Sequence, residues 1–409
     1  DRMPHDARKV VLVDGSGADS PDDTMLLNWS AFMQAPPKAG HRRIDADMAA
    51  IIYTSGSTGR PRGVVLSQRN LIAGAESVST YLGNTADDIL LAALPLSFDA
   101  GFSQLTTAFA AGATAVLLEY LVPNDVLLAI DRFSITGLTA VPPLWNHLVG
   151  LKWPPGAGNS LRYIANTGGA LPAATTQKLR ERLPSTDIYL MYGLTEAFRS
   201  TYLPPGEIDR IPNSIGRAIP NAEILVVDDD GELCRDGEPG ELVHRGALVA
   251  MGYWNDRENT ALRFRPAPGQ DPAITNREFA VWSGDVVTRD AQGFLYYVGR
   301  RDDMIKTSGY RVSPTEIEEI AYSSGLVKEA AAIGVPHPVL GQAIILVISA
   351  TEACADPGAR LSREFQAELP HYMHPKRIVL LGDLPHNQNG KIDRNALAEQ
   401  HASQFVAGD

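Results

Sequence analysis

The chain has 409 residues, of which 44% are hydrophobic and 21% are charged. This is the composition of a globular protein, and the length allows at least two domains. The net charge of −12 argues against a broad nucleic-acid-binding surface and against attraction to an anionic membrane.

Cysteine usage and hydropathy bear on where the protein works. Cys234 and Cys354 are far apart and match no metal-binding spacing; they could form one disulfide, but a reducing compartment fits them better. The longest apolar stretch, residues 105–122, contains Gly112 and Glu119 and is a poor membrane span. Residues 1–9 show no signal-peptide pattern. We therefore expect a cytoplasmic protein with no integral membrane span and no nucleic-acid partner.

The first half of the chain alternates between strand and helix patterns. A strand is predicted at residues 10–14 and a short helix at 25–33, followed by a polar linker at 36–43. Further strand-length apolar runs lie at 89–94, 113–118, 135–140, 162–165 and 187–192. Helical patterns lie at 67–82, with Ser67 as N-cap, and at 102–110 and 124–133. This alternation predicts a buried parallel sheet with helices on both faces.

The pattern of predicted strands and helices then changes twice. Short strand patterns at 223–227, 240–244 and 294–298, with turns such as Asp229-Asp230-Gly231, predict a small antiparallel barrel or sheet over 214–299. After Gly299, helices at 313–323 and 362–369 and strands at 330–335, 343–349 and 377–381 predict a compact α+β unit. The expected domains are therefore 1–299 and 300–409, with a hinge in the charged segment 299–303.

The most distinctive stretch is TSGSTGRPRG, residues 54–63. Small residues let the backbone approach a ligand closely, and hydroxyls with free N–H groups make a concave anion site. Arg60 and Arg62 add positive charge, although the Walker A spacing is absent. A solvated hairpin turn is the alternative, but such a turn needs only two to five residues. The stretch therefore predicts a phosphate-binding loop.

Four shorter motifs follow predicted strands or turns. YGLTE (192–196) places a hydroxyl and a carboxylate where they suit a phosphate and its Mg²⁺. TGGA (167–170) could let a flat base stack on the backbone, and WSGD (282–285) could aim a carboxylate at ribose hydroxyls. NGK (389–391) is a tight turn that presents a lysine. Taken singly, each motif also fits an ordinary turn.

Together, and in this order, the motifs resemble the adenylate-forming superfamily of acyl-CoA synthetases, nonribosomal-peptide adenylation domains and firefly luciferase. The likeness covers nearly the whole chain, and the matching stretches are YTSGSTGRPRGV, LPLSFDAG, NTGGALP, YGLTEA, GELVHRGALVAMGYW, WSGD, GRRDDMIKTSGYRVSPTEIE and NQNGKI. The resemblance implies an α/β fold: a large N-terminal domain of mostly parallel sheet with a small β-barrel, then a small mobile α+β C-terminal domain.

The resemblance also implies an activity. A carboxylic acid and MgATP would give an acyl-adenylate and pyrophosphate, and the acyl group would then pass to the thiol of CoA or of a carrier protein's phosphopantetheine. The C-terminal domain would rotate between these two steps. An inactive nucleotide-binding or scaffold protein that has kept the fold is the alternative.

Roles for single residues follow from the same resemblance. The ATP phosphates would be held by a group of loop residues, namely Thr54, Ser55, Gly56, Ser57, Thr58, Gly59 and Arg62. The remaining nucleotide and metal contacts would come from Gly169, Ala170 and Tyr192 at adenine, Asp285 and Arg300 at ribose, Thr195 at phosphate and Glu196 at Mg²⁺. Lys391 would act in the adenylation step, and Lys306 and Gly309 would act in the thiol step. Asp302 would be the hinge residue between the domains.

Three departures from the family pattern stand out. Arg62 replaces the usual lysine at the end of the loop, which keeps the charge but changes its geometry. Leu190 stands where a polar residue often reads the adenine amine, so that contact would come from backbone. Only 52 residues precede Tyr53. We therefore expect a truncation, a processed form or one piece of a larger protein.

The acid pocket would include Phe98, Asp99, Gly168, Gly193 and Arg199. The Phe98-Asp99 pair resembles adenylation domains for amino acids, in which the aspartate binds the α-ammonium group. A buried carboxylate is costly unless paired, so Asp99 should face a cation. Arg199 could pair with a second carboxylate of the substrate. Alternatively, Asp99 and Arg199 pair with each other, Arg199 points to solvent, or the substrate is a plain fatty or aryl acid.

Overall fold

The structure is a computed structural model that describes residues 10–12, 26–28, 30, 33, 34, 36, 40, 42–54, 61–301, 304–351, 356–386 and 391–405. The chain divides into two compact units, Asp1–Ile44 and Asp45–Asp409. In the first unit, β1 (Val10–Leu12) and β2 (Leu26–Asn28) form a parallel pair. The strand prediction is confirmed at 10–12. The helix predicted at 25–33 is wrong at 26–28, because pairing with a distant strand overrides the local helical pattern.

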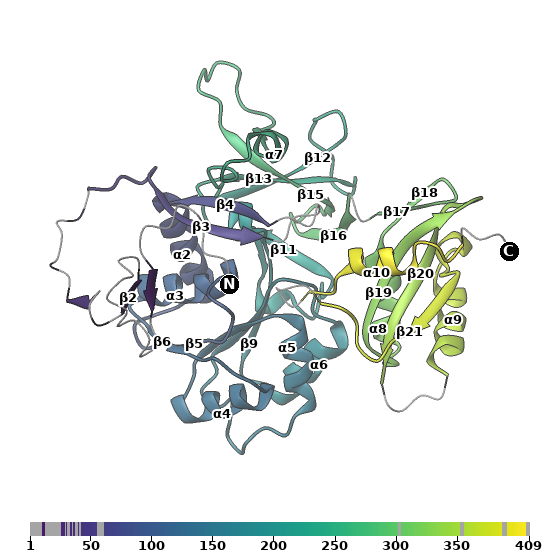
Figure 1. Ribbon diagram of the computed structural model, residues 1–409, viewed down its shortest axis with the longest axis horizontal. Helices are drawn as coiled ribbons and strands as arrows, with labels where there is room; N and C mark the ends of the chain where they lie inside the picture. Colours follow the sequence, from purple (N-terminus) through teal and green to yellow (C-terminus); the bar gives the residue numbers. More distant parts are fainter. Residues whose placement is uncertain are drawn as a thin grey trace. The chain divides into compact units, whose positions relative to one another are not determined.

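The second unit is built on a twelve-stranded sheet (Figure 1). Its strands lie in the order β12-β13-β15-β16-β11-β10-β9-β8-β7-β5-β6, and β14 pairs with β15. The parallel half consists of β5 (Ile89–Ala92), β6 (Thr114–Leu117), β7 (Gly137–Ala140), β8 (Tyr163–Asn166) and β9 (Asp187–Tyr192). These strands confirm the parallel sheet predicted from the alternating pattern.

Helices cover both faces of the parallel half. They are α2 (Gln68–Leu82), α3 (Asp99–Ala111), α4 (Pro123–Phe133), α5 (Pro142–Gly150) and α6 (Ala173–Arg182). Successive residues of a strand point to opposite faces. Accordingly, Tyr163 packs in a core with α2, whereas Ile164 packs in a core with α4 and α5.

The start of α2 shows how local sequence sets an element. Ser67 is the N-cap: its Oγ accepts a hydrogen bond from Asn70 N at 3.1 Å, and its own N donates to Asn70 Oδ1 at 2.8 Å. This capping box satisfies backbone donors that the first helical turn leaves without partners. The predicted N-cap is confirmed.

Antiparallel strands extend the same sheet. They are β10 (Thr201–Leu203), β11 (Ser214–Ala218), β12 (Ala222–Val227), β13 (Gly240–Gly246), β14 (Phe264–Pro266), β15 (Phe279–Arg289) and β16 (Leu295–Arg300). Strand β11 pairs with both β10 and β16, so the antiparallel strands join the parallel ones without a break. Nearby lie the hairpin of β3 (Met48–Thr54) and β4 (Arg62–Ser67), the helix α7 (Arg257–Arg263), and the 3₁₀ turns η1 (Thr195–Ala197) and η2 (Pro205–Glu207).

A separate five-stranded sheet follows residue 300, in the order β18-β17-β20-β19 with β21 on β20. Its strands are β17 (Ile305–Thr307), β18 (Tyr310–Val312), β19 (Val327–His337), β20 (Gly341–Ala350) and β21 (Arg377–Leu380). It is accompanied by α8 (Pro314–Ser323), α9 (Pro357–Glu368), η3 (His371–Met373) and α10 (Arg394–His401). The α+β prediction for this part is confirmed.

The domain boundary at residue 300 stays a prediction. It is supported by the hydrophobic clusters of the described residues, each of which lies wholly on one side of that residue. None of the helices in the described part of the chain has the length and hydropathy that a membrane crossing requires.

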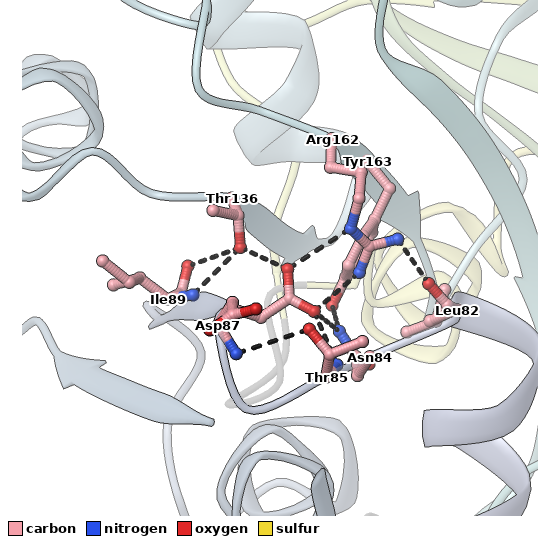
Figure 2. Close-up of polar contacts among 9 residues, drawn as sticks. Leu82, Asn84, Thr85, Asp87, Ile89, Thr136, Arg162 and Tyr163 are labelled. Carbon is pink, nitrogen blue, oxygen red and sulfur yellow. Dashed lines mark hydrogen bonds and ion pairs between the residues drawn. The ribbon is translucent and has the colours of Figure 1, made fainter. Parts of the chain in front are cut away.

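A polar network ties together the amino ends of three parallel strands (Figure 2). Its centre is Asp88, which is buried and precedes β5. The carboxylate accepts hydrogen bonds from Thr136 Oγ1 at 2.7 Å, from Arg162 Nη2 at 2.8 Å and from Thr85 N at 2.9 Å. Thr136 precedes β7 and Arg162 precedes β8, so one carboxylate fixes where three strands begin. Burial disfavours the charged form of this carboxylate and so raises its pKa. The hydrogen bonds favour the charged form more strongly, so the pKa of Asp88 is lowered overall.

We predict that Asp88→Asn lowers the free energy of unfolding by about 2–3 kcal/mol at pH 7, because hydrogen bonds to a charged acceptor are lost. A lowered native pKa stabilises the fold above the unfolded pKa of about 4, and this contribution disappears as pH falls through the native value. The difference between wild type and variant should therefore shrink below about pH 4 in urea titrations. Asp87→Asn, at the exposed neighbour, is the control. A difference that stays constant down to pH 2.5 would contradict this assignment.

Candidate active site

The turn after β8 brings backbone to the carboxyl edge of the parallel strands. Gly168 has a φ of +80°, and a β-carbon there would lie 3.2 Å from Val141 Cγ1 and 3.7 Å from Phe98 Cζ. Asn166 Nδ2 donates to Gly169 O at 2.8 Å and fixes the turn. Gly169 and the following Ala170 are exposed. This leaves an open backbone surface of the kind on which a flat ring can lie.

Tyr192 and Asp285 meet at the end of β9. Tyr192 ends β9, and its hydroxyl donates a short hydrogen bond to Asp285 Oδ2. Arg300 stands opposite Asp285 in the β15–β16 ladder, with its Nε 3.4 Å from Asp285 Oδ1. Burial raises the pKa of Asp285, and Arg300 and Tyr192 act against that rise. The result is an oriented carboxylate that suits vicinal hydroxyls such as those of ribose.

Glu196 lies in η1, directly after Thr195, and is buried. Its Oε1 accepts a hydrogen bond from Tyr253 Oη at 2.5 Å and lies 3.8 Å from Arg263 Nε. Burial, followed by the charge of Glu196, raises the pKa of Tyr253, so this phenol stays a donor. Both contacts hold the same carboxylate oxygen, and they orient the other for a further ligand.

Asp99 begins α3 directly after Phe98 and is buried. It accepts from Ala100 N at 2.7 Å and from Thr195 Oγ1 at 3.3 Å, and Arg199 Nη1 lies 3.9 Å from Asp99 Oδ2. Arg199 is also buried, so it does not point to solvent. Asp99 and Arg199 therefore form an ion pair with each other, which was one of the alternatives, and its distance of 3.9 Å is long.

The approach of Arg199 depends on an unusual backbone turn. Phe198 has a φ of 60°, in a region that bulky residues rarely adopt. The next residue, Arg199, then packs against Gly193, where a β-carbon would lie 3.1 Å from Arg199 Cα. Beside Arg199 is a cavity of about 20 Å³, lined mainly by α2, α3 and the sheet. That volume is room for about one water molecule.

Lys391 comes from the C-terminal part of the second unit and reaches this edge. Its Cε lies 4.0 Å from the position that a β-carbon at Gly168 would take. Although part of the residue is exposed, the protein around its ammonium lowers the pKa of Lys391 by desolvation. The charges of Asp99 and Asp285 act in the opposite direction. A lysine is thus placed between the predicted acid pocket and the predicted ribose carboxylate.

The predicted phosphate loop joins the strands of the β3–β4 hairpin. Thr54 and Arg62 are a cross-strand pair at its end, and the Arg62 guanidinium carbon lies 5.6 Å from the centre of the Tyr253 ring. The loop residues predicted to hold phosphate, Ser55, Gly56, Ser57, Thr58 and Gly59, lie outside the described residues. The hinge residue Asp302 also lies outside them.

The residues predicted for the thiol step sit on a different hairpin. Lys306 is an exposed residue of β17, and Gly309 makes the turn to β18 with a φ of +83°. Lys306 N donates to Gln342 Oε1 at 2.7 Å. Strand β17 of this hairpin pairs with β20, so Lys306 and Lys391 stand on different elements of the same α+β part.

Sequence reasoning did not single out Tyr253 and Arg263, whose side chains contact Glu196 in the candidate site. Tyr253 lies in the block GELVHRGALVAMGYW, which signalled the resemblance but not a role for its tyrosine. Arg263 ends α7, and its Nη1 donates to Trp282 O at 3.0 Å. A β-carbon at Gly284, which has a φ of +72°, would lie 2.9 Å from that Nη1. Glycine there admits the guanidinium beside Asp285.

These residues fit a nucleotide polyphosphate with Mg²⁺. Arg62, Arg263, Arg300 and Lys391 concentrate positive charge in an otherwise acidic chain. The described residues contain no group of three or more side chains of the metal-binding types His, Cys, Asp and Glu that could enclose a metal ion. Mg²⁺ is commonly held by one or two carboxylates plus substrate phosphates, and the oriented Glu196 carboxylate meets that requirement.

Comparison with known proteins identifies related families and structures. Residues 4–254 match the family described as AMP-binding enzyme, and residues 316–391 match the AMP-binding enzyme C-terminal domain. The indoleacetate–CoA ligase of Aromatoleum aromaticum is 29% identical over 84% of this chain and 66% of its own length. The L-proline–[L-prolyl-carrier protein] ligase of Streptomyces coelicolor is 32% identical over 97% of this chain and 75% of its own.

Solved structures agree with these matches. ATP-bound MatB from Rhodopseudomonas palustris superposes with a TM-score of 0.82 at 28% identity, over 90% of this chain and 71% of that one. The o-succinylbenzoate CoA synthetase MenE from Bacillus subtilis, in complex with its acyl-adenylate, gives 0.78 at 27% identity over 91% and 74%. The chain spans only 62% of a similar long-chain-fatty-acid–CoA ligase from Escherichia coli. On the family match to more than half of its residues, the chain belongs to the AMP-binding enzyme family, as the resemblance to adenylate-forming enzymes predicts.

Proposed function

We propose that this protein activates a carboxylic acid with MgATP and passes the acyl group to a phosphopantetheine thiol. The observation that carries the proposal is the meeting of Lys391 with Asp99, Gly168 and Asp285 at one edge of the sheet. Relatives named as CoA ligases and as a carrier-protein ligase support it, since both acceptors present the same thiol. CoA and a carrier protein are therefore the two candidate acceptors.

In the first step, a carboxylate oxygen of the acid attacks the α-phosphorus of ATP. The bond from that phosphorus to the bridging oxygen breaks, and pyrophosphate leaves. The attack brings two anions together, so cations must neutralise the developing charge. Lys391 lies where it would donate to the α-phosphate, and the Glu196 carboxylate would hold Mg²⁺, which neutralises phosphate charge when bound.

In the second step, the thiol sulfur attacks the acyl carbon, AMP leaves, and the thiol proton is released. The β17–β18 hairpin with Lys306 and Gly309 would serve this step after rotation of residues 300–409 about Asp302. One body that offers two faces in turn to one site accounts for two lysines on different elements.

The acid is proposed to carry an ammonium group. Asp99 is buried, and its guanidinium partner Arg199 is 3.9 Å away, so a closer cation would stabilise it. An acid with a second carboxylate could pair with Arg199. The prolyl-carrier-protein ligase among the relatives supports an amino-acid substrate.

Substitutions of Lys391 and Lys306 should affect different half-reactions. Lys391→Ala is expected to reduce acid-dependent exchange of labelled pyrophosphate into ATP at least 100-fold, because the α-phosphate loses its cation. Thioester formation from supplied acyl-adenylate should persist. Lys306→Ala should show the reverse, with CoA and carrier protein each tested as acceptor. Equal losses in both steps for both variants would contradict the two-face arrangement. ATP binding without any exchange would indicate a scaffold instead.

ATP affinity should depend on the protonation of Asp285. As pH falls through its raised pKa, the carboxylate gains a proton and loses acceptor capacity toward ribose. The KM for ATP should therefore begin to rise at a higher pH than an ordinary aspartate would cause. Asp285→Asn should raise KM about 10- to 100-fold and flatten the acid limb. Asp236→Asn, a surface partner of Arg289, is the control. An unchanged acid limb in Asp285→Asn would refute the ribose role.

Substrate class can be tested with a panel of amino acids, dicarboxylates and fatty acids. Wild type should prefer an amino acid, and Asp99→Ala should reduce that rate by at least about tenfold, because one charge-assisted hydrogen bond is worth about 1.5–3 kcal/mol. Arg199→Ala should selectively affect acids with a second carboxylate. Asp131→Ala, exposed on α4, is the matched control. Faster turnover of fatty acids, unaltered in Asp99→Ala, would rule out the ammonium partner.

A further inference from the structure

The segment that carries Lys391 is held on both sides of residues 387–390. His386 and Ile392 form a β-bridge, and Asp393 N donates to Pro385 O at 2.8 Å. Asp393 also caps α10, because its Oδ1 accepts from Ala396 N at 3.0 Å. Lys391 therefore lies three residues before α10, and these hydrogen bonds link the position of its segment to that helix.

An ion pair joins α10 to another helix of this part of the chain. Arg394, in the first turn of α10, places its Nη2 2.8 Å from Oε1 and 2.6 Å from Oε2 of Glu318. Glu318 is buried in α8, and its Oε1 also accepts from Ala332 N of β19 at 2.8 Å. The pair thus joins α8, β19 and α10 at one point.

The ion pair connects the segments of the two lysines, because of where α8 lies in the chain. Helix α8 begins directly after the β17–β18 hairpin, which carries Lys306 and Gly309. A second contact, His386 Nε2 to Glu329 Oε1 at 2.8 Å, also ties the Lys391 segment to β19, but its carboxylate side chain is 24% exposed against 8% for Glu318. Of the two contacts, the Glu318–Arg394 pair has the more buried carboxylate, while the Arg394 side chain is 36% exposed. The pair joins α8, which follows the hairpin of Lys306, to α10, which follows Lys391.

Burying the carboxylate of an ion pair is a costly way to gain stability alone. Apolar side chains of similar volume often stabilise a fold equally or better, whereas a charge-assisted hydrogen bond fixes direction as well as contact. We propose that Glu318 and Arg394 are positioning residues, which set the orientation of Lys391 for the adenylation step. The proposal rests on the proposed function, because the role of Lys391 belongs to it.

The test uses the full chain and the two separate half-reactions. Arg394→Met should lower the turnover of pyrophosphate exchange by about 10- to 100-fold, since misplacement by about 1 Å can cost 100-fold. The KM for ATP should change less than about twofold, and thioester formation from supplied acyl-adenylate less than about threefold. Arg394→Lys should recover most of the exchange, because it keeps a cation. Arg363→Met, exposed on α9, is the matched control and should behave as wild type.

The double variant Glu318→Gln with Arg394→Met separates positioning from stability. It removes both charges, so its melting temperature should recover relative to Arg394→Met while its exchange rate stays low. Recovery of both quantities, or a parallel loss of both half-reactions in Arg394→Met, would overturn the proposal. Lys391→Ala is the reference. If it retains exchange, the proposed role of Lys391 fails; if it loses exchange while Arg394→Met does not, only the positioning role fails.

Discussion

Three buried carboxylates at one edge of the large sheet each share the same kind of environment, a hydroxyl donor plus a guanidinium. The sets are Asp99 with Thr195 and Arg199, Glu196 with Tyr253 and Arg263, and Asp285 with Tyr192 and Arg300. A buried charge is tolerated only when it is paired and hydrogen-bonded. The donors keep the carboxylates in place without consuming all their acceptor capacity, which is the state that a binding site needs before its ligand arrives.

The order of elements and most of the motifs could be predicted from local sequence. The Ser67 cap, the parallel strands and the placement of YGLTE and TGGA after β9 and β8 depend on short-range patterns. The partners of the carboxylates could not be predicted. Tyr253 lies 57 residues from Glu196 in sequence, and Tyr253 also forms a β-bridge with the still more distant Val64. Such long-range pairings leave no periodic signal.

The error at residues 26–28 has the same origin. That segment forms a parallel pair with Val10–Leu12, and a partner strand can override the helical preference of a short stretch. The long contact of Asp99 with Arg199 is another feature that local sequence could not settle. Sequence reasoning allowed for it as an alternative, but only the turn at Phe198 makes it possible. Backbone geometry of that kind is set by packing rather than by residue type.

The Asp88 network lies at the amino ends of the parallel strands (Figure 2). The residues of the candidate active site on this sheet instead follow the carboxyl ends of β8 and β9. The strand starts are therefore secured by residues outside the proposed acid pocket. Under the proposed function, changes at Phe98, Asp99 or Arg199 would alter ligand preference while the starts of β5, β7 and β8 stay fixed. This separation makes the fold tolerant of divergence: new specificities can arise by substitution at one edge, without compensating changes in the frame that holds the strands.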